Sequence, residues 1–399
     1  MYLTREEEKI LQGDYGEGRR IAMELVVRVG EALGAERLIE INHAHASGIS
    51  YDNIGDAGLE FIKSLFIAGA QVSVYSTYNP VGISLNVDPP PRLNVDRDFA
   101  RKQMEIIRLL NSMGFVPSVT CIPYHMRQPR LGEHLAWGES SAIAVANSLY
   151  GARTNREGGP LALAAAIVGR TYYWGLHIDE NRKPTIHVKV NADVGEEPSA
   201  GLLGYYIGQN FSDTIPYVDL NKKLGKREAI SMCAAAAASG NIAMCIVRNV
   251  SPEDEGPPIG VEKAHVDQKE LKYVKEDIES ASIEEAEIFF TGCPHHEPSI
   301  VYKLFDYLSS KNIERLRREV WISIPGYASG DEKIRELARL LQRKNIYILP
   351  GTCIVVARLR GKVDVIATDS LKTAFYAPKR HGVRVAITSL WDFVKRFAE

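Results

Sequence analysis

The stretch that decides the fold runs from Glu287 to Leu349 and reads EIFFTGCPHHEPSIVYKLFDYLSSKNIERLRREVWISIPGYASGDEKIRELARLLQRKNIYIL. Its three short apolar runs are separated by two longer segments whose apolar residues recur at helical spacing. Parallel strands need long crossover connections, usually helices, so this alternation predicts a parallel sheet covered by helices. The predicted strands are 287–291, 319–324 and 345–349, and the predicted helices are 298–311 and 331–343.

The same alternation continues on both sides and predicts an α/β protein with several parallel-type sheets flanked by helices. Toward the C-terminus we expect strands 363–367 and 383–387 and helices 369–377 and 389–398. Toward the N-terminus we expect strands 37–41, 71–75, 115–121 and 242–247, helices 18–35, 56–68, 98–113, 226–239 and 268–280, and loops 42–50 and 76–80. Thr4 and Glu7 predict a capping box for a first helix.

The length of 399 residues exceeds the roughly 250–300 residues that one hydrophobic core usually serves, so we expect two or three subdomains. Their approximate boundaries are 1–135, an Ala- and Gly-rich 136–250, and 263–399. The Pro-rich segment 252–262 is the predicted linker between the last two subdomains.

The charge balance argues against two classes of partner. The chain has 48 Lys and Arg against 50 Asp and Glu, so its net charge of -2 gives no electrostatic reason to expect nucleic acid or an anionic membrane. No apolar run approaches the roughly 20 residues of a membrane span. The first eight residues, MYLTREEE, lack an apolar signal region, so we expect a cytoplasmic protein with reduced thiols.

Three of the five cysteines stand out by their position. Cys121, Cys293 and Cys353 come at or just after the ends of predicted strands, and ligands of open α/β sheets gather at the carboxyl ends of strands. Cys233 lies in an alanine-rich predicted helix and Cys245 inside a predicted strand. These two are expected to pack as small hydrophobic residues.

The spacing of the three strand-end cysteines leaves three interpretations open. Thiolates from three separate loops could hold an iron–sulfur cluster with one iron left open as a Lewis acid. They could also be unrelated loop cysteines, because the chain has no Cys-x-x-Cys pair. A zinc site is the third interpretation, with His295 or His296 as the expected fourth ligand.

Polar residues near predicted strand ends are candidates for binding or catalysis. His43 and His45 could be acid–base groups or ligands, or purely structural residues that bond to nearby backbone. Gly48 and Ser50 suit a turn with free N–H groups for an anion, and Asn79 before Pro80 could equally be a simple turn.

Two further groups open or precede predicted helices. Glu139 and Ser140 could bind substrate, or simply cap a helix. Lys372, at a helix N-terminus, suits an oxyanion, although a surface lysine is the ordinary alternative. The loop residues Arg153, Asn155 and Arg156 suit a carboxylate or phosphate, or a structural pairing with Glu157.

Seven motifs, spread from the first strand to the last quarter of the chain, occur together in one known family. They are His45–Ser50 (HASGIS), Thr77–Pro80 (TYNP), Trp137–Asn147 (WGESSAIAVAN), Gly151–Gly159 (GARTNREGG), Thr291–Pro294 (TGCP), Gly351–Cys353 (GTC) and Thr368–Lys372 (TDSLK). The block from Trp137 to Gly159 is the specific part. On these motifs the sequence resembles the aconitase X family.

The resemblance implies an aconitase-like arrangement of α/β subdomains around one iron–sulfur cluster. It implies that Cys121, Cys293 and Cys353 are the ligands of a 4Fe–4S cluster with one open iron, although 3Fe–4S or 2Fe–2S forms would use the same residues. Aconitase-like enzymes also use a mobile swivel domain, for which this chain has no room. The resemblance therefore implies a separate small subunit and a heterodimer.

The reaction implied by the resemblance is the loss of water from (R)-5-phosphomevalonate to give trans-anhydromevalonate 5-phosphate, in an archaeal mevalonate pathway of isoprenoid biosynthesis. The implied substrate-binding residues are Gly48, Ile49, Ser50, Asn79, Pro80, Glu139, Ser140 and Lys372, with Arg153, Asn155 and Arg156 as further candidates. Glu139, Ser140 and Lys372 are the implied catalytic residues, and the main base is expected on the small subunit. The alternatives are a hydroxyproline dehydratase of the same family and a non-catalytic iron–sulfur regulator that binds RNA.

Overall fold

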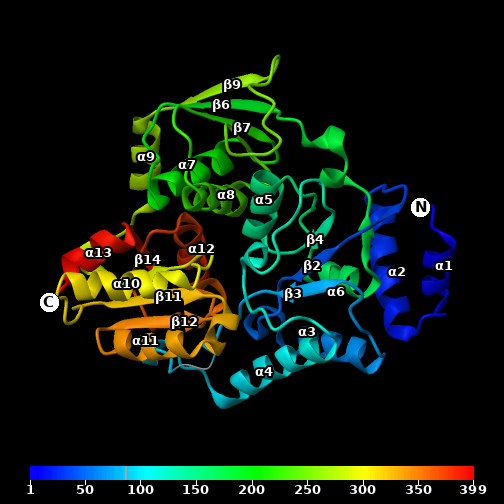
Figure 1. Cartoon of the computed structure of the whole chain (residues 1–399), viewed down its shortest axis with the longest axis horizontal. Coiled ribbons are helices and arrows are strands. Elements are labelled where there is room, and N and C mark those ends of the chain that lie inside the picture. The colour runs from blue at the N-terminus through cyan, green and yellow to red at the C-terminus, as the bar shows by residue number, and fades with distance from the viewer. Residues whose placement is uncertain (86–87) are drawn as a thin grey trace.

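Three parallel sheets and one antiparallel strand pair form the framework of residues 1–85 and 88–399, the part of the chain that the computed structural model describes (Figure 1). The helices are Arg5–Gln12 (α1), Glu17–Ala32 (α2), Tyr51–Ile67 (α3), Arg97–Ser112 (α4), Ser140–Tyr150 (α5), Gly159–Val168 (α6), Glu197–Asn210 (α7), Lys226–Gly240 (α8), Gln268–Ile278 (α9), Ser299–Ser310 (α10), Glu332–Gln342 (α11), Leu371–His381 (α12) and Leu390–Phe397 (α13). The strands are Leu38–Glu40 (β1), His43–Ala46 (β2), Tyr75–Tyr78 (β3), Leu135–Trp137 (β4), Arg170–Tyr172 (β5), Ile186–Val190 (β6), Pro216–Leu220 (β7), Ile246–Val247 (β8), Glu262–Val266 (β9), Ile288–Thr291 (β10), Glu319–Ile324 (β11), Ile346–Pro350 (β12), Val365–Thr368 (β13) and Arg384–Ile387 (β14). Each framework sheet is covered by helices, which confirms the predicted α/β class.

The C-terminal sheet has the strand order β12-β11-β10-β13-β14, and all its pairings are parallel. Its central strand β10 is buried on both faces, because Phe289 packs among residues of α10, α11 and α13 while Phe290 packs with residues of α12. This is the sheet that the sequence pattern predicted. A strand buried on both faces reads as a continuous apolar run, which is why the pattern was clear.

The N-terminal sheet has the order β3-β2-β4 and is also parallel. Two sequence predictions are wrong here, because the expected loops 42–50 and 76–80 contain β2 and most of β3. Both strands carry buried histidine, serine and threonine side chains where a core strand usually carries apolar ones. Because these segments lack the apolar pattern of a core strand, the sequence did not predict them as strands.

The predicted strand 115–121 is not a strand, although it runs beside β3. Val116 and Thr120 donate backbone hydrogen bonds to Ser76 and Tyr78. Between them, however, the Ser118 hydroxyl replaces the ladder: it accepts from the Tyr78 N–H at 2.7 Å and donates to the Tyr78 carbonyl at 2.9 Å. Val119 then has a φ of 41°, which no strand residue adopts.

The middle sheet has the order β8-β7-β6-β9 and is parallel. The sequence pattern predicted only its strand 242–247, of which β8 is the end, and assigned β6, β7 and α7 to no element. The segment 252–262 is not a link between subdomains, because it joins β8 to β9 within this one sheet. The approximate subdomain boundaries themselves remain a prediction.

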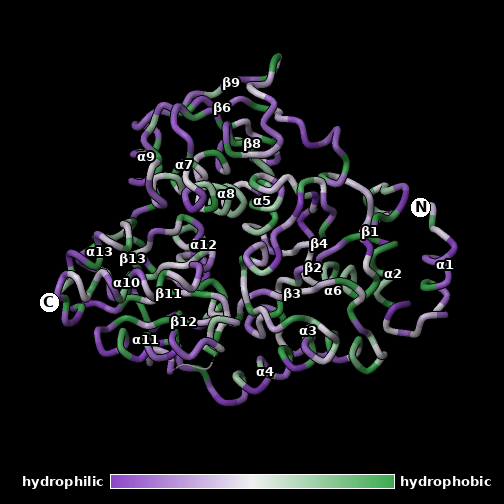
Figure 2. The backbone as a smooth tube through the Cα atoms, in the orientation of Figure 1, coloured by the Kyte–Doolittle hydropathy of each residue, from purple (hydrophilic) through white to green (hydrophobic). Residues whose placement is uncertain are grey.

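The alanine-rich helices α5 and α8 and the glycine-rich α7 lie between the middle sheet and the other two sheets (Figure 1). The tubes of α5 and α8 are pale to green in Figure 2, whereas the peripheral α1 is mostly purple. The small residues allow a very close crossing: a Cβ added at Gly204 of α7 would lie 2.1 Å from the Met232 carbonyl oxygen of α8. Across the described residues, no helix has the length and apolar character needed to cross a membrane.

A candidate active site between the sheets

The three strand-end cysteines lie on loops from two different sheets. Cys293 follows β10 and Cys353 follows β12, as the pattern predicted, whereas Cys121 follows the irregular segment beside β3. Gly292 shapes the first of these loops: its φ is 99°, and a Cβ there would lie 2.4 Å from the Ser323 carbonyl oxygen. Only glycine fits that turn.

The thiols of Cys121, Cys293 and Cys353 share one electrostatic environment. Burial raises the pKa of all three thiols, that of Cys353 to about 12, and the positive charge of Lys372 opposes this rise in each case. The charge of Cys293 also raises the pKa of the other two. Contacts agree with this: His295, two residues after Cys293, bonds to Cys121 Sγ and to the carbonyl of Thr352, the neighbour of Cys353, so the three cysteine loops meet here.

The two histidines that a zinc site would need are engaged elsewhere. His295 Nε2 lies 3.0 Å from the Thr352 carbonyl oxygen, to which it must donate, while its backbone N–H donates to Cys121 Sγ at 3.2 Å. His296 Nε2 bonds to the Thr291 hydroxyl. Within the described residues, no three Cys, His, Asp or Glu side chains converge closely enough for a single metal ion. A donor set of three thiols without a fourth side chain fits a larger cluster better than a zinc ion.

Glu139 and Lys372 form a buried ion pair beside these thiols. Glu139 caps α5, and its Oε1 accepts hydrogen bonds from the Ser141 backbone at 3.4 Å and the Ser141 hydroxyl at 3.0 Å. Lys372, in the first turn of α12, contacts the same Oε1 and donates to the Ser141 hydroxyl at 3.1 Å. The sequence prediction placed both residues in one site, and the structure brings them into contact.

The ion pair determines which ionisation state both side chains keep. Burial alone would raise the pKa of Glu139, but the charge of Lys372 and hydrogen bonds from Asn79 and Lys372 outweigh it and lower that pKa to about 2. Burial would likewise lower the pKa of Lys372, but the Glu139 carboxylate raises it well above its usual value. A fixed anion and a fixed cation therefore face the cysteine loops at neutral pH.

Asn79 connects this pair to two histidines that the sequence prediction had left without a definite role. Its Nδ2 donates to Glu139 Oε2 at 2.7 Å, and its Oδ1 lies 2.8 Å from His45 Nε2. His45 Nδ1 and His43 Nε2 each lie 2.8 Å from the Thr77 hydroxyl. Polar residues at alternate positions of two segments, His43 with His45 and Thr77 with Asn79, were the sequence signal for this network.

The loop Gly48–Ser50 lies at the carboxyl end of β2, where the sequence prediction expected an anion contact. Gly48 has a φ of 65° and open space around it. Gln103 of α4 holds the loop, since its amide donates to the Ile49 carbonyl at 3.2 Å and accepts from the Tyr51 N–H at 2.8 Å. The Ser50 hydroxyl is buried and has no hydrogen-bond partner among the described residues, so it is available to a bound molecule.

The remaining predicted residues divide between site and scaffold. Ser140 adjoins Glu139, and Pro80 adjoins Asn79. Arg156 lies close enough to Glu139 for that charge to raise its pKa, against the larger lowering effect of burial. Arg153 and Asn155 are used structurally: the Arg153 guanidinium pairs with Asp179 at 2.6 Å, and Asn155 Nδ2 donates to the Trp174 carbonyl at 3.0 Å.

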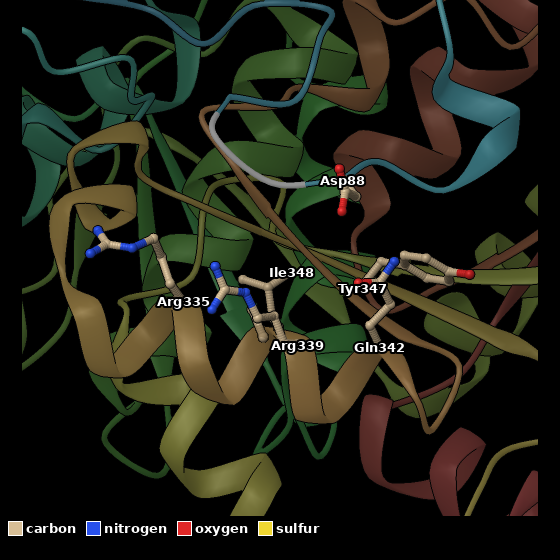
Figure 3. Close-up of a pocket in the computed structure, with 7 residues that line it drawn as sticks. Asp88, Arg335, Arg339, Gln342, Tyr347 and Ile348 are labelled. Atoms are coloured by element: carbon tan, nitrogen blue, oxygen red, sulfur yellow. The ribbon is translucent and has the colours of Figure 1, made fainter.

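A separate hollow of about 390 Å³ lies on the outer side of α11 and β12. In Figure 3, Arg335 and Arg339 project from α11 on one side of it, and Asp88 faces them from the other. Arg335 is already bound to the Ser329 carbonyl oxygen at 2.7 Å. This hollow includes none of the residues predicted for the site.

Comparison with known proteins accounts for the whole chain. Family models of the first, second and third domains of aconitase X match residues 1–180, 184–281 and 286–399. The phosphomevalonate dehydratase large subunit of Thermococcus kodakarensis is 40% identical over 99% of both chains, and that of Aeropyrum pernix is 40% identical over 98% of both. A cis-3-hydroxy-L-proline dehydratase of Pseudomonas aeruginosa is 32% identical over 96% of this chain but only 68% of its own length. The crystal structure of Thermococcus kodakaraensis aconitase X in its holo-form superposes over 100% of both chains with a TM-score of 0.90 and 38% identity.

Proposed function

This chain belongs to the aconitase X family, and we propose that it is the large subunit of a dehydratase that converts (R)-5-phosphomevalonate into trans-anhydromevalonate 5-phosphate. The observation that carries this proposal is end-to-end similarity to phosphomevalonate dehydratase large subunits. Five such relatives are 34–40% identical to the chain over nearly the full length of each. The hydroxyproline dehydratases are 28–32% identical, and the chain spans only 67–68% of their length.

We propose that Cys121, Cys293 and Cys353 hold an iron–sulfur cluster of the 4Fe–4S type. Their convergence beside Lys372, whose charge favours thiolates over thiols, supports this assignment. When bound, such a cluster with three protein ligands supplies one open iron as a Lewis acid for the hydroxyl group that leaves as water. A reducing cytoplasm, which we propose as the location, keeps the three thiols available.

The side chains around the cysteines would bind and orient the substrate. Lys372 supplies a buried positive charge for a substrate anion, and the unpaired Ser50 hydroxyl together with the open turn at Gly48 supplies neutral donors. Glu139 is a fixed carboxylate, so it is suited to orient the departing hydroxyl group by accepting a hydrogen bond from it. Ile49 and Pro80 shape the walls, and Ser140 adds a hydroxyl beside Glu139.

The substrate carries both a carboxylate and a phosphate, so a second cation is required besides Lys372. Of the two loop arginines, Arg153 is neutralised by its pair with Asp179, whereas Arg156 donates to the Ala237 carbonyl at 3.3 Å, which leaves its charge available. We propose that Arg156 contacts one of the two anionic groups.

We propose that a separate small subunit completes the active site with a swivel domain and the main catalytic base. The name "large subunit" of the relatives supports a two-subunit enzyme. The greater length of the hydroxyproline dehydratases agrees with this, since this chain covers about two thirds of each.

The test is a dehydration assay on the chain purified anaerobically together with its small subunit. We expect dehydration of phosphomevalonate and no reaction with cis-3-hydroxy-L-proline. Absence of product from a complex with an intact cluster would reject the proposed substrate, and turnover of hydroxyproline would identify the alternative enzyme. Salt-sensitive RNA binding by an inactive complex would instead support the regulatory alternative.

The cluster ligands can be tested independently of turnover. Replacing Cys121, Cys293 or Cys353 by alanine should abolish the visible absorbance of the cluster. Cys233→Ala and Cys245→Ala are matched controls, since both thiols are fully buried in the core near α8 and β8, and their variants should keep the absorbance. An alanine variant of the first three that retains the full spectrum would remove that residue from the ligand set.

A further inference from the structure

A continuous hydrogen-bond chain runs from His43 through Thr77, His45 and Asn79 to Glu139. Its four links measure 2.8, 2.8, 2.8 and 2.7 Å. The residues come from β2, from β3 and the turn after it, and from the start of α5, so the chain crosses the N-terminal sheet from its interior to the active site. The side chains of His43, Thr77 and His45 are fully buried.

The orientation of the Asn79 amide follows from its neighbour at the end of the chain. Glu139 is ionised beside Lys372 and can only accept hydrogen bonds. Asn79 must therefore direct its NH₂ group toward Glu139 and its oxygen toward His45. An amide turned the other way would set two oxygens against each other.

The same reasoning fixes both histidines. The Asn79 oxygen needs a donor, so His45 carries its proton on Nε2. Burial lowers the pKa of His45 to about 4, so the ring is neutral and its Nδ1 accepts the proton of the Thr77 hydroxyl. Thr77 then accepts from His43 Nε2, and every hydrogen bond points toward Glu139.

The surroundings of His43, the first residue of the hydrogen-bonded series, agree with this direction. The scheme leaves His43 Nδ1 as a bare acceptor, and this buried atom has no hydrogen-bond partner among the described residues. An unpaired buried acceptor is tolerated more readily than an unpaired N–H. The Trp137 ring packs against both imidazoles, with centroids 5.1 and 6.2 Å away, so the rings cannot turn easily.

We propose that His45 is a positioning residue: its Nε2–H holds the Asn79 amide in the one orientation that serves both Glu139 and the substrate. Thr77 and His43 hold His45 in the required tautomer. The link to substrate rests on the proposed function, because Asn79 contacts substrate only in that assignment. The direction of the hydrogen bonds does not depend on it.

The direction can be measured without substrate or small subunit. In the full chain labelled with ¹⁵N-histidine, NMR should show both rings in the Nε2–H tautomer, with the signal of His45 identified by its loss in His45→Gln. A His45 ring with its proton on Nδ1, or a charged ring, would refute the proposal.

Glu139→Gln supplies a sharper test, because it should reverse the donor–acceptor direction of all four hydrogen bonds. The new amide must set its oxygen toward Lys372, which only donates, and hence its NH₂ group toward Asn79. The Asn79 amide then turns over, and His45 and His43 both move their protons to Nδ1. Unchanged tautomers in this variant would show that the two histidines are not coupled to Glu139 through Asn79, and would refute the proposal.

The effect on catalysis is tested with two substitutions of His45, each of which imitates one nitrogen of the imidazole ring. A glutamine side chain places a donor where Nε2 was, whereas an asparagine reaches only as far as Nδ1. His45→Gln should keep most of the dehydratase activity, and His45→Asn should lower kcat/KM by roughly 10- to 100-fold, the usual effect of losing a residue that orients a reacting group.

The control is His187→Asn, which removes another buried strand histidine, bonded to Asp219 in the middle sheet. It should leave kcat/KM unchanged. Equal activity of His45→Gln and His45→Asn in folded complexes would refute the positioning role. An inactive wild-type complex with the expected tautomers would instead reject the proposed function and leave the hydrogen-bond direction standing.

Discussion

Two buried carboxylates, Glu139 and Glu157, show how a single neighbour decides the charge of a residue. The carboxyl of Glu139 faces the Lys372 ammonium, and its pKa falls to about 2. The carboxyl of Glu157 is more deeply buried, and within the described residues it accepts hydrogen bonds only from the hydroxyls of Thr171 and Tyr172. Burial therefore prevails over these two bonds and raises its pKa to about 7. Nothing in the residue type distinguishes the two.

The raised pKa of Glu157 predicts a pH dependence of stability. An unfolded chain loses this proton near pH 4.5, whereas the folded chain keeps it to about pH 7. Unfolding releases the proton between these values, so the contribution is complete below pH 4.5 and is lost as pH rises to 7, by about 3 kcal/mol. Glu157→Gln should flatten the free energy of unfolding measured from pH 5 to 8. Parallel profiles of wild type and variant would contradict the assignment.

The buried pair of Glu139 and Lys372 predicts a stability effect that is separate from activity. Lys372→Met leaves the carboxylate buried without its cation, so the free energy of unfolding should fall by about 3 kcal/mol. Adding Glu139→Gln removes the stranded charge and should restore most of that loss, while the dehydratase activity of the double variant stays low. Denaturant unfolding of the two single variants and the double variant measures this. Additive losses would show that the two side chains do not interact.

At the element scale, the predictability of a strand followed the chemistry of its buried side chains. The apolar run with Phe289 and Phe290 predicted β10 correctly, because both faces of that strand pack against apolar helices. β2 and β3 were not predicted, because they carry polar side chains such as His43 and Thr77. These buried side chains form hydrogen bonds with each other across the two strands. Such cross-strand bonds exist only once the sheet has formed. Local sequence therefore could not reveal them.

The crossing of α7 and α8 predicts a strong dependence on one glycine. A methyl group at Gly204 would meet the Met232 carbonyl oxygen at 2.1 Å, and backbone cannot yield as a flexible side chain can. Gly204→Ala should therefore lower the free energy of unfolding by about 1–3 kcal/mol, even though alanine favours helices. The control is Gly330→Ala, where the new methyl group meets open space. Equal stability of the two variants in denaturant would contradict the close crossing.

For the whole molecule, the sequence identified the cysteine ligand candidates better than the polar residues around them. Strand ends of parallel sheets point to one edge, which was enough to select Cys293 and Cys353. Cys121 was selected for a reason that failed, because its preceding segment is not a strand. The separation of Arg156 from Arg153 needed the fold, since only the structure shows that Arg153 pairs with Asp179. The cysteine ligation itself remains a prediction.

Ion pairs join segments that lie near the site but far apart in the sequence. Asp52, two residues after Ser50, lies 3.0 Å from Arg358 and 3.0 Å from Arg380 of α12. Arg380 also donates to the Asn53 side chain at 3.1 Å and to the Val355 carbonyl at 3.3 Å, close to Cys353. These contacts tie the first turn of α3 to the loop after β12 and to the helix that carries Lys372.

This connection predicts measurable coupling between residues more than 300 positions apart. The side chains of Asp52 and Arg380 are 20% and 41% exposed, so solvent weakens the pair, and a double-mutant cycle of Asp52→Asn with Arg380→Gln should give about 0.5–1 kcal/mol. The coupling should shrink in high salt, because exposed charges are screened. The pair of Arg384 and Glu285, 50% and 46% exposed, is the comparison and should couple more weakly. A cycle energy of zero for Asp52 and Arg380 at low salt would mean that this ion pair does not help to hold α3 against α12.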